Sequence, residues 1–336
     1  MDANLPPVSV LIPALNEAGY IKQCIESIIS GSYPSEKLEV LVIDGGSADD
    51  TIPCARMADL KSASLRIVRN QKKIVPAAMN IGLAEATNEV IIWVGAHAIY
   101  SSRYIETLVT TLTKRNCGSV GGLLLPRGET LIGKSIAAAT SSKFGIGNAK
   151  YRFAKDVCEV ETVFGGCWYR SDIIKIGGFN ENWVRNQDFE LNTRIRKLIG
   201  PLVLNPAAQC HYFCRQSFKS LAKQYFQYGY WRWKTVLTHR DTFSARYAAP
   251  PFLLLSLFMS LVMALAGLKF WFWVPSFYLA TLLAHSVFLT VRHKNLFFLI
   301  LLPVTLMIVH LTWATGFYSG FFNSLFSSKQ RDLTKL

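Results

Sequence analysis

Two stretches of the chain decide the fold: VSVLIPALNE at residues 8–17 and VLVIDGGSADDT at residues 40–51. In each stretch an apolar run, rich in β-branched residues, ends at small and polar residues. Such runs predict strands that are buried on both faces of a sheet. Between them, apolar residues recur at helical spacing from Ile21 to Ile29, and Asn16 is placed to cap that helix.

The same alternation continues to residue 94. We expect a helix from near Asp49, a strand at 65–68, a helix from Pro76 to Ala86 and a strand at 89–94. Strands that alternate with helices predict an α/β domain, with a mixed, mostly parallel sheet covered by helices on both faces. Ligands of such sheets bind beyond the carboxyl ends of the strands, which are here residues 13–17, 44–49 and 95–98.

Two polar strand ends side by side favour a nucleotide pocket. Either end alone would be explained as a turn with a helix cap. Together, the carboxylate of Asp44 could accept hydrogen bonds from a base or ribose, and the neighbouring glycines let a ligand approach the backbone. The first turn lacks the GxGxxG pattern, which argues against a dinucleotide-dependent dehydrogenase.

The last third of the chain is apolar. Residues 252–268, 270–291 and 296 to about 322 are long enough to cross a bilayer. The formal charges in this region, Lys269, Arg292 and Lys294, fall in the joints between these segments. This pattern predicts a multi-pass membrane region at residues 250–326, with about three segments, because a soluble helix needs a polar face.

Charge sets the expected orientation. With the N-terminal domain in the cytoplasm, at the inner face of the cell membrane, the Arg292–Lys294 joint also lies inside, as the positive-inside rule favours. Three full spans would place the basic tail at 327–336 outside, against that rule. Alternatively, Pro303, Gly316 and Gly320 break the third segment into a bent or re-entrant helix.

The formal net charge of +14 fits anionic lipid headgroups and a phosphate-bearing substrate. No nucleic-acid-binding motif accompanies it, so we expect no nucleic-acid partner. The 7 cysteines form no CxxC pair and are expected to be free thiols.

The ordered motifs resemble the family 2 glycosyltransferases, which have the GT-A fold. The resemblance covers residues 8 to about 240 and rests on the two opening stretches, VPAAMNIGLAEA (75–86), VGAHA (94–98) and the segment FGGCWYRSDIIKIGGFNENWVRNQDFELNTRIR (164–196). Among subgroups the chain looks closest to membrane-bound enzymes that build exopolysaccharides on a lipid carrier, the succinoglycan-type glucosyltransferases. The phrases AHA, NQDFELNTRIR and QYFQYGYWRW carry that finer resemblance.

The family implies an inverting transfer from a nucleotide-diphosphate sugar, usually UDP-linked. By this resemblance Asp188 is the base that takes the proton of the acceptor hydroxyl. Without the resemblance, Asp188 is equally well explained as a helix N-terminal charge. The nucleotide-binding candidates are Pro13, Ala14, Asn16, Glu17, Asp44, Gly46, Asp49, Lys73 and Asn80.

One motif departs from the family. The family commonly has Asp-x-Asp after the fourth strand, binding Mg²⁺ or Mn²⁺ and the diphosphate, whereas this chain has Gly95-Ala96-His97. These three residues remain the donor-diphosphate candidates. Either His97 helps to hold a metal, or a cation such as Lys73 or Arg185 partly replaces it, or activity is weak or lost.

The acceptor side is expected at residues around the base and on one helix. Residues 217–238 mix aromatic and basic side chains, which predicts an interfacial amphipathic helix at the end of the catalytic domain (1–240). An ordinary docking helix is the alternative. The acceptor candidates are Gly165, Gly166, Trp168, Arg185, Gln187, Trp231 and Arg232. The processive signature QxxRW is not met, which favours addition of a single sugar.

The sequence therefore predicts a glycosyltransferase that adds one sugar, from a UDP-hexose, to a lipid-linked saccharide such as a polyprenyl-phosphate-linked one. The alternative is a catalytically silent nucleotide-sugar-binding or scaffold protein of a polysaccharide complex, motivated by Gly95. A transporter is disfavoured, because three spans are few for a pore.

Overall fold

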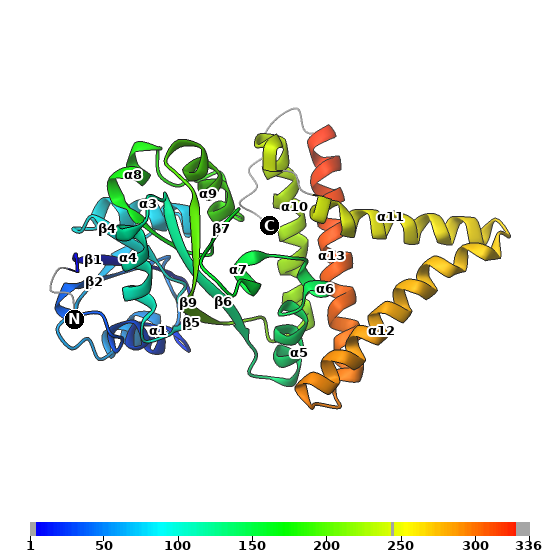
Figure 1. The fold of residues 1–336 in the computed structure, drawn as a ribbon, viewed down its shortest axis with the longest axis horizontal. Helices are drawn as coiled ribbons and strands as arrows, with labels where there is room; N and C mark the ends of the chain where they lie inside the picture. Colours follow the sequence, from blue (N-terminus) through cyan, green and yellow to red (C-terminus); the bar gives the residue numbers. More distant parts are fainter. Residues whose placement is uncertain (1–4, 243–244, 327–336) are drawn as a thin grey trace. The chain divides into compact units, whose positions relative to one another are not determined.

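A computed structural model describes residues 5–242 and 245–326 of the chain (Figure 1). The chain divides into two compact units. The first contains residues 1–125 and 150–212, and the second contains residues 126–149 and 213–336. Residues 126–149 and 213–240, which the sequence placed in the catalytic domain, thus pack with the apolar C-terminal region. The predicted basic tail at 327–336 lies outside the described residues.

The first unit is built on one sheet with the strand order β3-β2-β1-β4-β8-β6-β9-β5, and β7 pairs with β9. The strands are β1 Val8–Ala14, β2 Leu38–Asp44, β3 Ser64–Arg69, β4 Val90–Trp93, β5 Ala98–Tyr100, β6 Ser119–Arg127, β7 Cys158–Val160, β8 Gly166–Tyr169 and β9 Leu202–Phe213. The pairs β1–β2, β1–β4 and β2–β3 are parallel. The pairs β4–β8, β6–β8, β5–β9 and β7–β9 are antiparallel. The sheet is mixed as expected, and the parallel pairs named above join its first four strands, where the alternating pattern is found.

Helices cover the faces of this sheet. They are α1 Ile21–Ile29, α2 Thr51–Arg56, α3 Val75–Glu85, α4 Tyr104–Lys114, α7 Lys150–Phe153, α8 Arg170–Lys175 and α9 Gln187–Leu198, with the short helix η1 Ser35–Lys37. The apolar stripe of α1 and the alternate residues Val8, Val10 and Ile12 of β1 belong to one buried cluster. Leu11 of β1, Met79 of α3 and Trp168 belong to a second cluster. Because side chains alternate across a strand, each face of β1 has its own core.

The second unit is helical. Its elements are α5 Leu131–Thr140, α6 Lys143–Ile146, α10 Phe218–Thr238, η2 Arg240–Thr242, α11 Ala245–Leu265, η3 Lys269–Phe272, α12 Trp273–His293 and α13 Phe298–Phe326. Three stretches in the described part of the chain are long and apolar enough to cross a membrane: Tyr247–Leu265, Lys269–His293 and Phe298–Phe326. They coincide with the three segments predicted from composition.

Helix α13 is continuous over its 29 residues, so Pro303, Gly316 and Gly320 do not break it. The two glycines serve packing instead, since α10 lies along α13 (Figure 1). A Cβ atom at Gly316 would lie 2.0 Å from the carbonyl oxygen of Phe226, and one at Gly229 would lie 1.9 Å from that of Trp313. Small residues four apart allow this close approach of two backbones, as in membrane helix pairs.

Candidate active site

The turn after β2 is organised around Asp44. Its carboxylate is buried and accepts hydrogen bonds from the backbone N–H of Gly46 at 2.9 Å and the hydroxyl of Ser47 at 2.6 Å. The N–H of Ser47 also donates to it, at 3.1 Å. These donors orient the carboxylate at the carboxyl end of the strand, where a ligand of a parallel sheet binds.

The turn after β1 is linked to the turn after β2. Asn16 adopts the left-handed conformation (φ 56°), its N–H donates to Ser47 Oγ at 2.9 Å, and its Oδ1 accepts from the N–H of Ala48 at 2.9 Å. The N–H of Glu17 donates to Thr51 Oγ1 at 2.7 Å. Asn16 does not cap α1, whose N-cap residue is Tyr20. It instead links the turn after β1 to the turn after β2 through these hydrogen bonds.

Asp49 and Lys73 lie beside these two linked turns. Asp49 Oδ2 accepts from the N–H of Ala18 at 3.2 Å, and the Thr51 hydroxyl holds the pKa of the Asp49 carboxyl below its usual value. A Cβ atom at Gly46 would lie 3.8 Å from Lys73 Nζ, which places this ammonium beside the turn. Gly46 itself has a φ of 81°, a conformation that favours glycine.

Asn80 is engaged in a different way from the other nucleotide-binding candidates. Its Nδ2 donates to the carbonyl oxygen of Phe179 at 2.9 Å, and its Oδ1 accepts from the N–H of Phe179 at 2.8 Å. Glu181 of the same loop accepts from Asn80 at 3.2 Å and forms an ion pair with Lys72 at 2.6 Å. Asn80 thus holds the loop that leads to α9, and its contact with a nucleotide remains a prediction.

The end of β4 is less densely bonded. The hydroxyl of Tyr100 accepts from the Gly95 N–H at 2.7 Å, and the Cys24 thiol donates to the Gly95 carbonyl at 3.4 Å. Burial raises the pKa of both Tyr100 and Cys24, so both groups stay protonated. A Cβ atom at Gly95 would lie 3.6 Å from Phe164 Cζ, an ordinary contact, so the backbone has room for a side chain here.

His97 links the end of β4 to the turn after β1. Its Nδ1 lies 3.0 Å from Glu17 Oε1, and the side chain of His97 is 43% exposed. Ala96, which lies between Gly95 and His97 in the sequence, is buried. The predicted residues at the ends of β1 and β4 are thus brought together by a direct side-chain contact.

Gly165 and Gly166 lie beside the end of β4, because Gly166 pairs with Trp93. A Cβ atom at Gly165 would lie 2.6 Å from the Trp93 carbonyl oxygen, and both glycines have positive φ values. Trp168, predicted with them as an acceptor residue, is fully buried in the second core cluster. We therefore assign Trp168 to the core that supports the site.

Asp188 lies in the first turn of α9, half-buried, and its Oδ1 accepts from the N–H of Phe189 at 2.8 Å. Arg185 and Gln187 are half-buried on either side of Asn186. One turn further, Asn192 Nδ2 donates to the Val163 carbonyl at 2.9 Å and to Thr162 Oγ1 at 2.8 Å. The helix that carries Asp188 is therefore fixed to the same segment, 162–166, that borders Gly95.

Asn186 is a further candidate for the site, which the sequence analysis does not include. It is left-handed (φ 57°) directly before α9, and its buried side-chain nitrogen has no hydrogen-bond partner among the described residues. Strained residues of this kind occur at functional sites, and asparagine tolerates this conformation better than most. An asparagine two residues before a predicted base was the available signal.

The two acceptor candidates on α10 belong to the second unit. Trp231 is buried, and the guanidinium carbon of Arg232 lies 4.1 Å from the ring centroid of Tyr247. Lys234 lies over the Trp231 ring at 4.6 Å. These contacts combine aromatic and basic groups as predicted for this helix, and their role toward an acceptor remains a prediction.

The described residues contain no group of three or more His, Cys, Asp or Glu side chains arranged to hold a metal ion. Glu17 and His97 are the nearest arrangement, with two donors. Magnesium-type sites in nucleotide enzymes commonly combine one or two protein ligands with phosphate oxygens and water, and Mn²⁺ accepts imidazole. The pair therefore fits a cation whose coordination a bound diphosphate would complete.

Comparison with known proteins gives consistent matches. A family model described as glycosyl transferase family 2 matches residues 9–177. The succinoglycan biosynthesis protein ExoA of Rhizobium meliloti is 29% identical over 313 residues, which cover 92% of this chain and 93% of that protein. A dolichyl N-acetyl-α-D-glucosaminyl phosphate 3-β-D-2,3-diacetamido-2,3-dideoxy-β-D-glucuronosyltransferase of Methanococcus voltae is 27% identical over 322 residues, or 93% and 96% of the two chains.

Among solved structures, the mannosyltransferase PcManGT of Pyrobaculum calidifontis, in complex with GDP-mannose and Mn²⁺, is similar with a TM-score of 0.57. The match covers 97% of this chain and 89% of that one, at 16% sequence identity. At this identity the similarity establishes the fold, which includes the helical second unit as well as the sheet.

Proposed function

The chain belongs to glycosyltransferase family 2, and from this premise we propose that it transfers one sugar, with inversion, from a nucleotide-diphosphate sugar to a lipid-linked saccharide. One observation carries the proposal. Helix α9, which carries Asp188 in its first turn, is fixed to residues 162 and 163 through Asn192, and the end of β4, next to Gly95, is paired with Gly166. A base and a diphosphate corner around one glycine turn are what a direct displacement requires.

The residues divide into two roles. The joined turns after β1 and β2 would hold the nucleoside, with the oriented Asp44 carboxylate accepting hydrogen bonds from the base or ribose and Lys73 facing the phosphates. The Asp188 carboxylate would accept the proton of the acceptor hydroxyl as its oxygen bonds to the anomeric carbon. The bond from that carbon to the diphosphate breaks on the opposite face, and the diphosphate leaves with the electron pair.

Charge on the leaving diphosphate has to be neutralised. Glu17 and His97 would hold a Mg²⁺ or Mn²⁺ ion, which supplies this neutralisation when bound. Lys73, beside Gly46, is the protein cation best placed to share the task. Arg185 is half-buried two residues before Gln187 and is the second cationic candidate.

The acceptor proposal rests on the apolar helices. Three of them are long enough to span a membrane, and the relative from M. voltae is named for a dolichyl-phosphate-linked acceptor. A lipid carrier would present its saccharide at the membrane surface, to the enzyme's own membrane helices. Because the family's donors are usually UDP-linked, UDP-hexose is the first donor class to test, and the similarity to a succinoglycan biosynthesis protein supports exopolysaccharide or another surface glycan as the product class.

We place the catalytic unit at the cytoplasmic face of the cell membrane. The end of β6 and the residue after it line one cavity with the end of α12, since Pro126, Gly128 and His293 all border it. That joint carries Arg292 and Lys294, and basic joints remain in the cytoplasm. A reporter inserted into this joint should therefore have the same accessibility as one placed in the catalytic unit.

A second function follows from Gly95. Because the chain lacks a carboxylate at this position, a protein that binds nucleotide sugars without transferring them is the specific alternative. Such a protein would serve as a scaffold in a polysaccharide-synthesising complex.

A donor panel tests the proposal. Purified protein in lipid vesicles would be incubated with UDP- and GDP-sugars, Mn²⁺ and a membrane lipid extract, and the lipid products analysed by mass spectrometry. We expect one donor to extend a lipid-linked saccharide by one sugar. Hydrolysis without lipid product would contradict the acceptor, and no consumption of any donor would favour the scaffold.

A further inference from the structure

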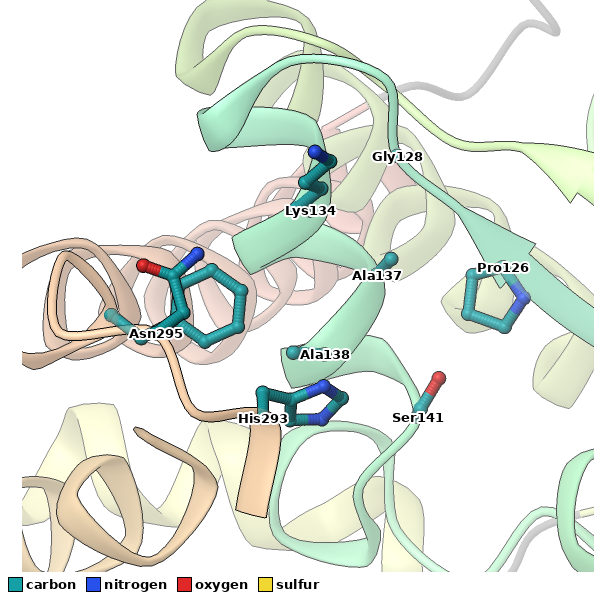
Figure 2. A pocket seen from close by; sticks show the side chains of 9 residues that line it. Pro126, Gly128, Lys134, Ala137, Ala138, Ser141, His293 and Asn295 are labelled. Atoms are coloured by element: carbon teal, nitrogen blue, oxygen red, sulfur yellow. The ribbon is translucent and has the colours of Figure 1, made fainter. Parts of the chain in front are cut away.

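A cavity of about 270 Å³ lies within the second unit, between α5 and the joint that connects α12 to α13. Figure 2 shows Lys134, Ala137, Ala138 and Ser141 along one stretch of chain, opposite His293 and Asn295. Its remaining lining comes from Pro126, Gly128 and Phe298. None of these residues belongs to the candidate active site, so the cavity needs a separate explanation.

The cavity is lined or flanked by basic side chains. Lys134 and His293 line it, and Arg292 and Lys294 flank His293 in the joint. No acidic residue occurs between Asp241 and Asp332, so this joint has no carboxylate from its own helices. In the described ranges none of these four basic side chains forms an ion pair. Asn295 adds a side-chain amide to the wall. A lysine ammonium, an imidazole and a side-chain amide, with no carboxylate in the lining, favour an anionic ligand.

The surroundings of the cavity are apolar. Ala137, Ala138 and Phe298 form part of its wall. Next to the joint, Val291, Leu296 and Ile300 are 71%, 79% and 74% exposed. A small water-soluble anion would make no use of these side chains, whereas a molecule with a charged head and a hydrocarbon chain would cover them.

The position also suits a lipid. The cavity lies where two candidate membrane helices meet, and basic side chains at such joints lie at the depth of the lipid headgroups. Basic pockets between membrane helices bind phosphate-bearing headgroups. We propose that this cavity binds the phosphate group of a membrane lipid, with Lys134 and His293 as its principal donors. A polyprenyl phosphate and an anionic phospholipid share this chemistry.

The test measures lipid bound to the full chain, purified in detergent and transferred to phosphatidylcholine vesicles. The probes are polyprenyl phosphate, phosphatidylglycerol and inorganic phosphate, each titrated separately against intrinsic tryptophan fluorescence and by native mass spectrometry. The variants are Lys134→Ala and Lys134→Arg. Lys269→Ala is the matched control, because Lys269 is an exposed lysine at the opposite joint, between α11 and α12.

We expect Lys134→Ala to weaken binding of at least one phospholipid or polyprenyl probe by about tenfold, as for the loss of one charge-assisted hydrogen bond. Lys134→Arg should retain binding, and Lys269→Ala should match the wild type. The polyprenyl and phospholipid arms identify the source of the headgroup. Equal losses for Lys134→Ala and Lys269→Ala would overturn the site, as would tighter binding of inorganic phosphate than of either lipid. Because binding is measured without a sugar donor, failure of the proposed transfer would leave this result intact.

Discussion

The turns after β2 and after β4 lie at the same edge of the sheet, but they are built differently. After β2, the buried Asp44 carboxylate accepts three hydrogen bonds. Asn16 and Glu17, in the turn after β1, add further hydrogen bonds to this turn. After β4, the hydrogen-bond partners of Gly95 among the described residues are the neutral groups of Tyr100 and Cys24, and His97 contacts the carboxylate of Glu17. The turn proposed to hold the nucleoside is therefore organised by hydrogen bonds without a ligand, whereas the turn proposed to face the diphosphate has room for a side chain at Gly95.

The two turns would therefore contribute to different steps, one to nucleotide binding and the other to catalysis. A preorganised pocket gains affinity because little ordering is left to do on binding. Neutralising a leaving diphosphate requires charge, and the turn after β4 supplies little of its own. Under the proposed mechanism, Lys73 or a bound cation would supply the charge that this turn lacks.

The largest effect is expected at Asp188. If the open diphosphate side supports transfer, Asp188→Asn should lower the transfer rate about 10²- to 10⁴-fold, the usual contribution of a general base. Binding of the nucleotide should change little. Initial rates of nucleoside-diphosphate release, measured at saturating donor and lipid acceptor, would give the factor.

Asp172→Asn is the matched control for this variant. Asp172 is also an acidic residue in the first turn of a helix, α8, so its loss reproduces any effect on a helix dipole. Equal rates for the two variants would show that Asp188 is a helix-terminal charge and not the base.

A smaller effect is expected at Asp44, whose carboxylate accepts three hydrogen bonds. Asp44→Ala leaves the N–H groups of Gly46 and Ser47 without their acceptor, which should cost about 1–3 kcal/mol of stability. Nucleotide affinity should fall with it. Denaturant unfolding and calorimetric UDP titration would measure both. Ser47→Ala, which removes one hydroxyl only, should fall between wild type and Asp44→Ala; an unchanged stability in Asp44→Ala would show that the turn is not preorganised by this carboxylate.

The smallest effect is expected from filling the open side. A Cβ atom fits at Gly95, so Gly95→Asp should fold and add a hard oxygen ligand beside His97. We expect the apparent affinity for Mg²⁺ or Mn²⁺ to rise about tenfold, equivalent to about 1.4 kcal/mol. Gly95→Ala controls for bulk alone. No change in metal dependence would mean that this position does not face the diphosphate.

The sequence predicted most of the first four strands and the three apolar helices, because each is a long run with a single period. It did not predict the contacts that the candidate site residues make within the protein. Asn80 and Asn16 bind neighbouring loops in the structure, and only tertiary structure reveals those partners.

Other features had no local signal. Residues 126–149 pack with the C-terminal helices through Ser135 and Thr305, which lie 3.0 Å apart between side-chain oxygens, and nothing in a stretch of small apolar residues indicates such a partner. Gly316 and Gly320 pack against α10. Because this packing depends on a second helix, the sequence alone suggests only that these glycines could break α13.

We expect the hydrogen-bonded turns after β1 and β2 and the open turn after β4 to support sugar transfer together. The most direct measurement follows UDP-sugar binding and UDP release in one preparation of wild-type protein, with lipid acceptor, in Mn²⁺ and again after chelation. We predict binding with acceptor-dependent release of UDP, slowed by removal of the metal. Tight binding of the donor with no release under either condition would contradict the claim and identify a silent nucleotide-sugar-binding protein.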